Sequence, residues 1–186
     1  MSSIWIVPAL LVACVATSAR AVDWKVDPTA SELRFTATFE RSPATGIFRK
    51  FDATVQFAPD HPADSRIDVV VAVPSADMSS AQINDAIRGP DWFDATRFPV
   101  AEFHSTQVRS AGGDRYLADG TLTVKGRTKP VEVPFTWKSA GDLATMDGEL
   151  TLDRSAFGIG LGEWRSTKEI GASVVVRFSL RLRKGG

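Results

Sequence analysis

Most of the chain alternates apolar and polar side chains with a period of two residues. In segment 33–40, Leu33, Phe35, Ala37 and Phe39 share one phase, and charged or hydroxyl side chains share the other. Such alternation is typical of a β-strand with one buried face and one solvated face. The remaining runs predict about eight strands in all, at 51–57, 67–73, 101–106, 116–124, 131–137, 146–153 and 174–182, with a shorter run at 22–26.

The spacing of these strands predicts an all-β fold. Connections of hairpin length favour antiparallel pairing with one wet face. About eight such strands best hide their edges by closing into an extended antiparallel barrel. The outer phase of the last strand carries Arg177, Arg181 and Arg183, which is ordinary solvated surface and not the apolar lipid face of an outer-membrane barrel.

The alternation stops between the third and fourth long strands. Ser79 with Gln82 fits a capping box, and Gly89–Pro90 fits a C-terminal stop, so one short helix is predicted over 79–88. The segment 89–103 follows with four large aromatic residues and two prolines, a poor pattern for a central strand. We interpret it as an aromatic turn that plugs one end of the barrel.

Glycine and proline mark three further features. Ser42–Gly46 is predicted to be a turn. Pro134 falls on the outer phase of its strand, which indicates an edge strand or a bulge. Gly158, Gly160 and Gly162 lack the strand–helix context of a nucleotide-binding loop, so they predict a loop at the barrel rim.

The inward phase determines whether the barrel is filled or hollow. It carries both bulky and small residues, among them Ala37, Ala53, Ala101 and Ala118. If the small residues cluster, they leave an apolar cavity for a long, uncharged chain; if they interleave with the aromatic residues, they fill the barrel. For the hollow case the predicted lining residues are Phe35, Phe39, Phe48, Val71, Ile83, Trp92, Phe93, Phe103, Trp137, Phe157 and Phe178, with Arg165 and Lys168 as candidate head-group contacts at the mouth.

The N-terminus predicts export. Residues 4–16 are almost wholly apolar but too few to span a bilayer comfortably, and an Ala-x-Ala site ends at Ala21. Residues 1–21 are therefore predicted to be a signal peptide, residues 22–186 one domain, and the protein periplasmic. The sequence Leu11–Cys14 resembles a lipobox, so lipid anchoring at Cys14 is the minor alternative. Cys14 is the only cysteine, which excludes an internal disulfide.

Composition and polar motifs point away from several functions. Lys+Arg 22 equals Asp+Glu 22, so net charge indicates no nucleic-acid face. Neither His61 nor His104 has a second ligand at metal-binding spacing, and no nucleophile elbow is present. We therefore expect no catalytic residues, no metal and no cofactor.

The motifs along the chain resemble those of the YceI family of exported bacterial proteins. They are Trp24-Lys-Val-Asp27, Gly46-x-Phe48-x-x-Phe51, Asp91-Trp-Phe-Asp-Ala-x-x-Phe-Pro99, Gly120-x-Leu122-Thr-Val124-x-Gly126 and Phe157-Gly158. The resemblance runs from about Trp24 to Leu182. It departs at Thr29–Ser31 and Glu40–Ser42, where many members of the family have a histidine.

The resemblance implies a lipocalin-like barrel that holds a polyisoprenoid or similar long amphiphile, for transport, storage or sequestration. The small molecule that we expect to be bound is accordingly an isoprenoid, a quinone or a fatty-acyl lipid. It also implies a periplasmic or secreted location and no known catalytic activity. The alternative function is a stress-protective or structural exported barrel with a filled core, acting through protein partners. An uncovered apolar edge would allow a homodimer.

Overall fold

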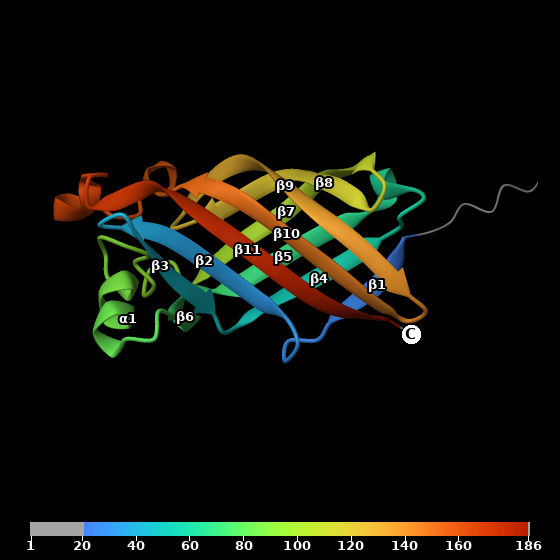
Figure 1. Cartoon of the computed structure of the whole chain (residues 1–186), viewed down its shortest axis with the longest axis horizontal. Coiled ribbons are helices and arrows are strands. Elements are labelled where there is room, and N and C mark those ends of the chain that lie inside the picture. The colour runs from blue at the N-terminus through green and yellow to red at the C-terminus, as the bar shows by residue number, and fades with distance from the viewer. Residues whose placement is uncertain (1–20, 186) are drawn as a thin grey trace, which may run out of the picture.

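Antiparallel strands make up most of the computed structural model, which describes residues 21–185 (Figure 1). Their alternating apolar residues face inward, as the period of two requires. The strands are β1 (Val22–Val26), β2 (Glu32–Phe39), β3 (Ser42–Phe48), β4 (Phe51–Phe57), β5 (Arg66–Ala72), β6 (Ala76–Asp77), β7 (Val100–Gly112), β8 (Arg115–Val124), β9 (Arg127–Ala140), β10 (Leu143–Asp153) and β11 (Ile170–Lys184). One α-helix, α1 (Ala81–Arg88), and four 3-10 turns, η1 (Pro62–Asp64), η2 (Val73–Ser75), η3 (Arg154–Phe157) and η4 (Gly162–Arg165), complete the described elements.

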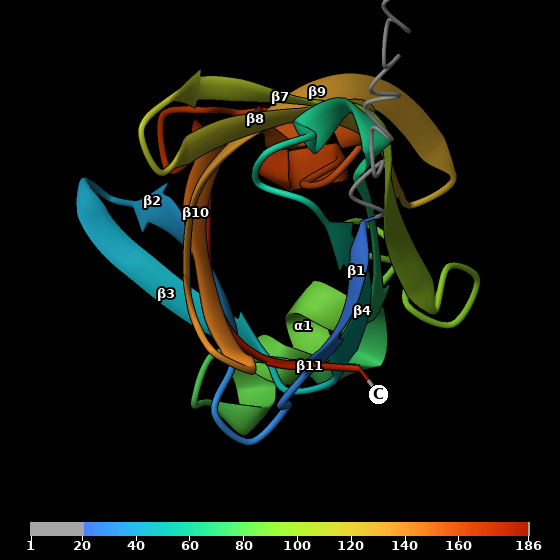
Figure 2. The same cartoon turned by 90° about the vertical axis from the view of Figure 1, so that its right-hand side faces the viewer.

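The sheet closes on itself because β1 pairs with both β4 and β11. Three wall positions are each shared by two successive strands. β1 and β2 both pair with β11. On their other sides, β4 pairs with β1 and β3 pairs with β2. β5 then pairs with β4, and β6 pairs with β3. The wall therefore has eight antiparallel positions. The predicted eight-stranded barrel, with one helix between the third and fourth long strands of the prediction, is confirmed. Figure 2 looks along this ring from the β1 end, with α1 at the far end.

The predicted turn at Ser42–Gly46 is wrong. These residues belong to β3, and the chain reverses one step earlier, at Glu40 and Arg41. Both residues have positive φ, 46° and 70°, which is the conformation of a two-residue hairpin turn. That turn usually contains asparagine or glycine, so Glu40–Arg41 gives no sequence signal for it.

The prolines of β9 mark an edge, as predicted for Pro134. The backbone N–H of Trp137 donates to Asp114 on the β8 side, so the nitrogens of even-numbered residues, including Pro130 and Pro134, face β10. Proline cannot donate there. The ladder between β9 and β10 accordingly ends at the pair Phe135–Gly148, while β8 continues to pair with β9 down to Arg127.

The helix and the aromatic segment lie at one end of the barrel, beside β3 and β6 (Figure 1). The N-cap is Ser80 and not the predicted Ser79: the Ser80 hydroxyl accepts a hydrogen bond from the Ile83 amide at 3.4 Å. The segment 89–99 then folds back on the helix, since the amide of Phe93 donates to the carbonyl of Ile87 at 3.0 Å. We call residues 89–99 the plug.

The other end of the barrel is filled by side chains. Trp24 and Trp137 meet edge to face at 5.1 Å between ring centroids, and Phe57 lies 4.5 Å from Trp137. These rings belong to the largest cluster of buried apolar residues, which also contains Tyr116 and Phe135. The barrel is therefore closed at the β1 end by a packed core.

Candidate functional site

An apolar cavity of about 680 Å³ occupies the barrel between the packed core and the α1 end. Among its lining residues only Gln82, Glu102 and Arg154 have amide or charged side chains. Glu102 lies on the outward phase of β7 and directs its carboxylate to His104 outside the barrel. The interior is thus suited to a long hydrocarbon and offers little to a polar ligand.

The wall of the cavity follows directly from the strand period. On β11 the alternate residues Val174, Val176, Phe178 and Leu180 line the cavity, whereas Arg177 points outward to Glu149. A bulge near the start of β11 still leaves Ile170 on the wall. The ten steps of strand from Ile170 to Leu180 correspond to about 33 Å. The cavity is therefore long as well as apolar.

The small inward residues divide into two groups with different roles. Ala37, Ala53, Ala101 and Ala118 line the cavity, so they leave open volume. Glycines instead lie beneath aromatic rings: a Cβ at Gly46, Gly120 or Gly148 would overlap the ring of Phe35, Phe103 or Phe178, respectively. The alanines leave the cavity open, and the glycines make room for the aromatic residues that line it.

Nearly all residues predicted to line a ligand cavity do line this one. They are Phe35, Phe39, Phe48, Val71, Ile83, Trp92, Phe93, Phe103, Phe157 and Phe178. Trp137 does not: it is 4% exposed and packs in the core at the β1 end. It has the inward phase, but it lies too near the closed end of the barrel to reach the cavity.

The cavity reaches the surface beside α1. Phe39 at the end of β2 and Ile83 on α1 both line it, yet they remain 43% and 44% exposed. Gln82 of α1 is also exposed there. An apolar rim that is open to solvent at this end and a packed floor at the other define a tunnel that opens beside α1.

The cation on the cavity wall is not one of those predicted. Arg165 and Lys168 are exposed and do not line the cavity. Arg154 lines it and is 3% exposed, with its guanidinium 6.0 Å from the ring of Trp92. Burial lowers the pKa of Arg154. The sequence did carry a signal, because Arg154 continues the inward phase of Met146, Gly148, Leu150 and Leu152.

Every hydrogen bond described for the Arg154 guanidinium goes to a backbone carbonyl. The acceptors are Ile159, Gly160, Trp164, Ser166, Ile170 and Gly171, at 2.9 to 3.3 Å. Asp153, its neighbour in sequence, turns its carboxylate to Ser155 instead. No carboxylate among residues 21–185 is within ion-pair distance of Arg154, so its hydrogen bonds come from backbone carbonyls, while the charge of Asp153 acts on it without direct contact.

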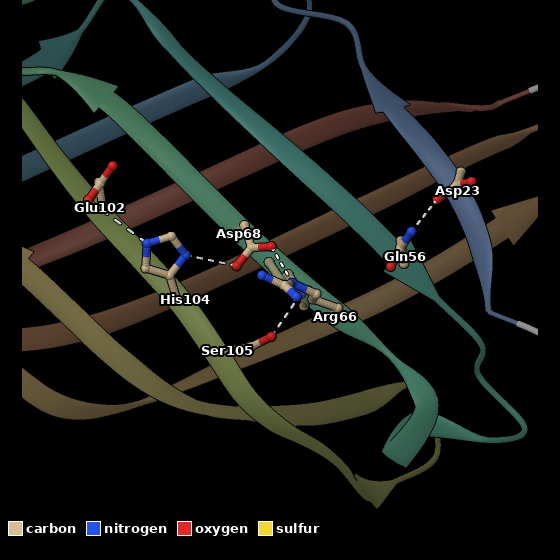
Figure 3. Close-up of polar contacts among 8 residues, drawn as sticks. Asp23, Gln56, Arg66, Asp68, Glu102, His104 and Ser105 are labelled. Atoms are coloured by element: carbon tan, nitrogen blue, oxygen red, sulfur yellow. Dashed lines mark hydrogen bonds and ion pairs between the residues drawn. The ribbon is translucent and has the colours of Figure 1, made fainter.

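The histidine with the most polar contacts lies on the outer face of the barrel (Figure 3). His104 Nδ1 is 2.9 Å from Asp68 Oδ1. Burial raises the pKa of Asp68, but hydrogen bonds from Arg66 and His104 outweigh it and lower the pKa overall. Ser105 accepts a hydrogen bond from the Ile67 amide on the next strand, on the opposite phase from His104. Ser105, His104 and Asp68 therefore do not have the arrangement of a nucleophile, its base and the group that orients the base.

Two comparisons place the chain among proteins with the same barrel. A family model described as the YceI-like domain matches residues 24–182. The crystal structure of BcnA from Burkholderia cenocepacia is 37% identical, with 84% of this chain and 98% of BcnA covered and a TM-score of 0.82. A polyisoprenoid-binding domain from Saccharophagus degradans, implicated in plant cell wall breakdown, is 16% identical, with 88% and 99% covered and a TM-score of 0.69. At that identity the likeness shows the fold alone.

Further relatives are known as UPF0312 proteins. One from Photorhabdus laumondii is 35% identical over 86 residues, which is 46% of this chain and 44% of the relative. One from Yersinia pestis is 34% identical over 119 residues, which is 62% of each protein. The matches therefore span less than two thirds of the length of these relatives.

Proposed function

Because this chain belongs to the YceI-like family, we propose that it binds a polyisoprenoid, a quinone-like lipid or another long-chain amphiphile inside the barrel, for transport, storage or sequestration. The observation that carries the proposal is the apolar tunnel that opens beside α1. The description of the Saccharophagus relative as a polyisoprenoid-binding domain supports the same class of ligand.

The walls favour one orientation of such a ligand. Near the floor the lining residues Ile67, Ala118, Met146 and Leu180 are all buried and apolar. A polar group there would lose its hydration without a hydrogen-bond partner, which is costly. The hydrocarbon tail accordingly lies toward the floor, and the head group lies at the mouth near Gln82 and solvent.

The cavity argues against the alternative function, in which a filled barrel acts through protein partners. A chain with that role would need no tunnel of about 680 Å³. A binding role also fits the family and its solved relatives better than catalysis. Polar side chains that could form a reaction centre are scarce on the cavity wall, where most lining residues are apolar.

The cellular context of this function is an inference from the N-terminal sequence. Residues 1–20, which contain Cys14 and most of the predicted signal peptide, lie outside the described residues. We expect export to the periplasm, with lipid anchoring at Cys14 as the minor alternative. No helix among residues 21–185 is long and apolar enough to cross a membrane. A homodimer stays a prediction.

Titration with lipids of graded length tests the proposed function. Intrinsic tryptophan fluorescence should change on addition of a long polyprenol or a long-chain quinone, because Trp92 and Trp164 line the cavity. A short prenyl alcohol should bind more weakly, since each CH₂ removed from apolar contact forfeits about 0.8 kcal/mol. Absence of binding across prenyl, quinone and fatty-acyl series would contradict the proposal.

A further inference from the structure

The segment between η3 and β11 lies over the same end of the barrel as α1 (Figure 1). We call residues 158–169, which contain η4, the cap. Ile159 and Trp164 of the cap line the cavity, and so does Ile170 where β11 begins. The ring of Trp164 lies 5.8 Å from that of Trp92 in the plug. The cap therefore forms part of the wall near the mouth without belonging to the barrel ladder.

Arg154 is the centre around which the cap folds. Four of its carbonyl acceptors, those of Ile159, Gly160, Trp164 and Ser166, belong to the cap, and two more belong to the start of β11. Gly160 has a φ of 73°, and a Cβ there would overlap Nη1 of Arg154. The close approach of the cap to the guanidinium thus requires glycine at this position.

A second set of contacts joins the cap to the plug. The amides of Gly160 and Leu161 both donate to the carbonyl of Asp91, at 2.8 and 2.9 Å. Lys125 bridges the same two segments, because its Nζ donates to the carbonyls of Pro90 and Gly158 at 2.7 and 2.9 Å. Both cations hold backbone carbonyls here, beside the apolar contacts that Ile159 and Trp164 make.

Such contacts can open without leaving a group unsatisfied. A guanidinium that loses carbonyl partners when the cap lifts gains water molecules in their place, and the net free energy of such an exchange is small. Left-handed glycines at Gly158 and Gly162, with φ of 68° and 59°, lie at the first position of the cap and at the start of η4 within it. A cap held by packed apolar side chains would have no comparable open state.

Building on the proposed function, we propose that the cap is a lid over the lipid-binding tunnel and that Arg154 is the positioning residue that holds it closed. The lid limits how fast a ligand enters and leaves. Because opening precedes both steps, loosening the lid raises both rates together and changes the equilibrium affinity little.

The test is the kinetics of Arg154→Met with cis-parinaric acid, a fluorescent polyene fatty acid, as probe. Methionine keeps an unbranched side chain and removes the charge and all donors. Stopped-flow mixing should show association and dissociation rates that are both raised about tenfold, with the dissociation constant changed by less than about twofold. Arg177→Met is the matched control: Arg177 lies outside the barrel with Glu149, and its loss should leave both rates unchanged.

Other kinetic outcomes contradict the proposal that the cap is a lid. Unchanged rates in Arg154→Met would show that the cap does not limit exchange. A raised dissociation rate alone, with weaker binding, would show that Arg154 acts by contacting the bound ligand and not by holding the cap closed. If Arg154→Met does not fold by near-ultraviolet circular dichroism, Arg154→Lys replaces it; lysine keeps the charge but lacks the planar fork, so an increase of the same kind but smaller is expected.

A measurement without ligand separates this inference from the proposed function. Amide hydrogen exchange at Gly160 and Leu161 reports contact between cap and plug directly. Faster exchange at these amides in Arg154→Met, with core amides unchanged, supports the lid. This holds even if the wild-type protein binds no cis-parinaric acid, because failure to bind counts against the proposed function and not against the lid. Equal exchange in the two proteins overturns the lid whether or not lipid binds.

Discussion

The ring of Phe178 on β11 lies across Gly148 on β10, its direct partner in the antiparallel ladder. A Cβ at residue 148 would overlap the ring, and the carbonyl oxygen of Pro134 lies on the same side. The missing side chain on one strand thus makes space for the aromatic wall residue on the next. Gly120 on β8 likewise makes space for the ring of Phe103 on β7, which lies diagonally across the ladder from it.

Gly148→Ala should therefore destabilise the barrel, because Phe178 must leave its rotamer or β10 must shift. Overpacking of this kind costs about 1–3 kcal/mol. Urea unfolding monitored by fluorescence measures the change. Gly171→Ala is the control: its Cβ would meet only ordinary contacts, at 3.4 Å or more from Thr38, so its stability should be nearly that of the wild type. Equal effects of the two substitutions would contradict the account.

Ala118→Phe should block the tunnel. Ala118 lies on β8, is buried and lines the cavity, so a phenyl ring there would occupy the space proposed for the lipid tail. We expect at least about a tenfold loss of affinity for a long polyprenol, measured by tryptophan fluorescence. Leu117→Phe places the same ring on the outer phase of β8 and should bind normally. Retained binding in Ala118→Phe would place the ligand elsewhere.

Trp137→Ala and Phe93→Ala should separate packing from binding. Trp137 belongs to the closed core, so its removal should cost about 3–5 kcal/mol of unfolding free energy while the remaining folded protein still binds lipid. Phe93 lines the cavity beside Phe48, at 6.0 Å between ring centroids, so its removal should weaken lipid binding at a smaller cost in stability. Denaturation measures the loss of stability in both variants, and lipid titration measures the loss of affinity. A larger loss of stability in Phe93→Ala and a larger loss of affinity in Trp137→Ala would contradict the proposed floor and wall.

Asp77 should make the helix end of the barrel sensitive to acid. Hydrogen bonds from Asn84, the Ser79 amide and Arg49 lower the pKa of Asp77 from 3.8 to about 2. A depressed pKa in the folded state means that this stabilisation is complete above the unfolded value and is lost as pH falls from about 4 toward about 2.

Comparison of the wild type with Asp77→Asn tests this linkage. The melting temperature of the wild type should exceed that of Asp77→Asn near neutral pH, and the difference should shrink as pH falls through the interval between 3.8 and about 2. A difference that does not depend on pH would show that the ionised carboxylate of Asp77 does not anchor the start of α1.

The barrel and most of its cavity wall could be predicted because both follow from a period of two residues. The alternation that makes β11 a strand also assigns Val176 and Phe178 to the interior. Period alone does not give depth along the barrel, which is why Trp137 has the correct phase and lies in the core. Depth depends on register, and register depends on the turns.

The parts that could not be predicted lack a periodic pattern. Glu40 and Arg41 form a tight turn without glycine or asparagine, so β3 was hidden. The cap has no repeat that would show which side chains face inward. For this reason Arg165 and Lys168 were predicted to contact a head group, although both lie exposed and away from the cavity. Arg154 interrupts an apolar inward phase, and such a charged residue marks a position that deserves a search for partners. The partners themselves could not be predicted, because they are backbone carbonyls that no sequence pattern marks.

Native mass spectrometry of the protein purified from its own host tests the central claim most directly. The account predicts an added mass in the hydrophobic lipid range that organic extraction releases, that is identified as a prenyl, quinone or fatty-acyl compound, and that is absent from Ala118→Phe prepared in parallel. Repeated recovery of protein without added mass, together with no uptake of these lipids when they are supplied, would contradict it.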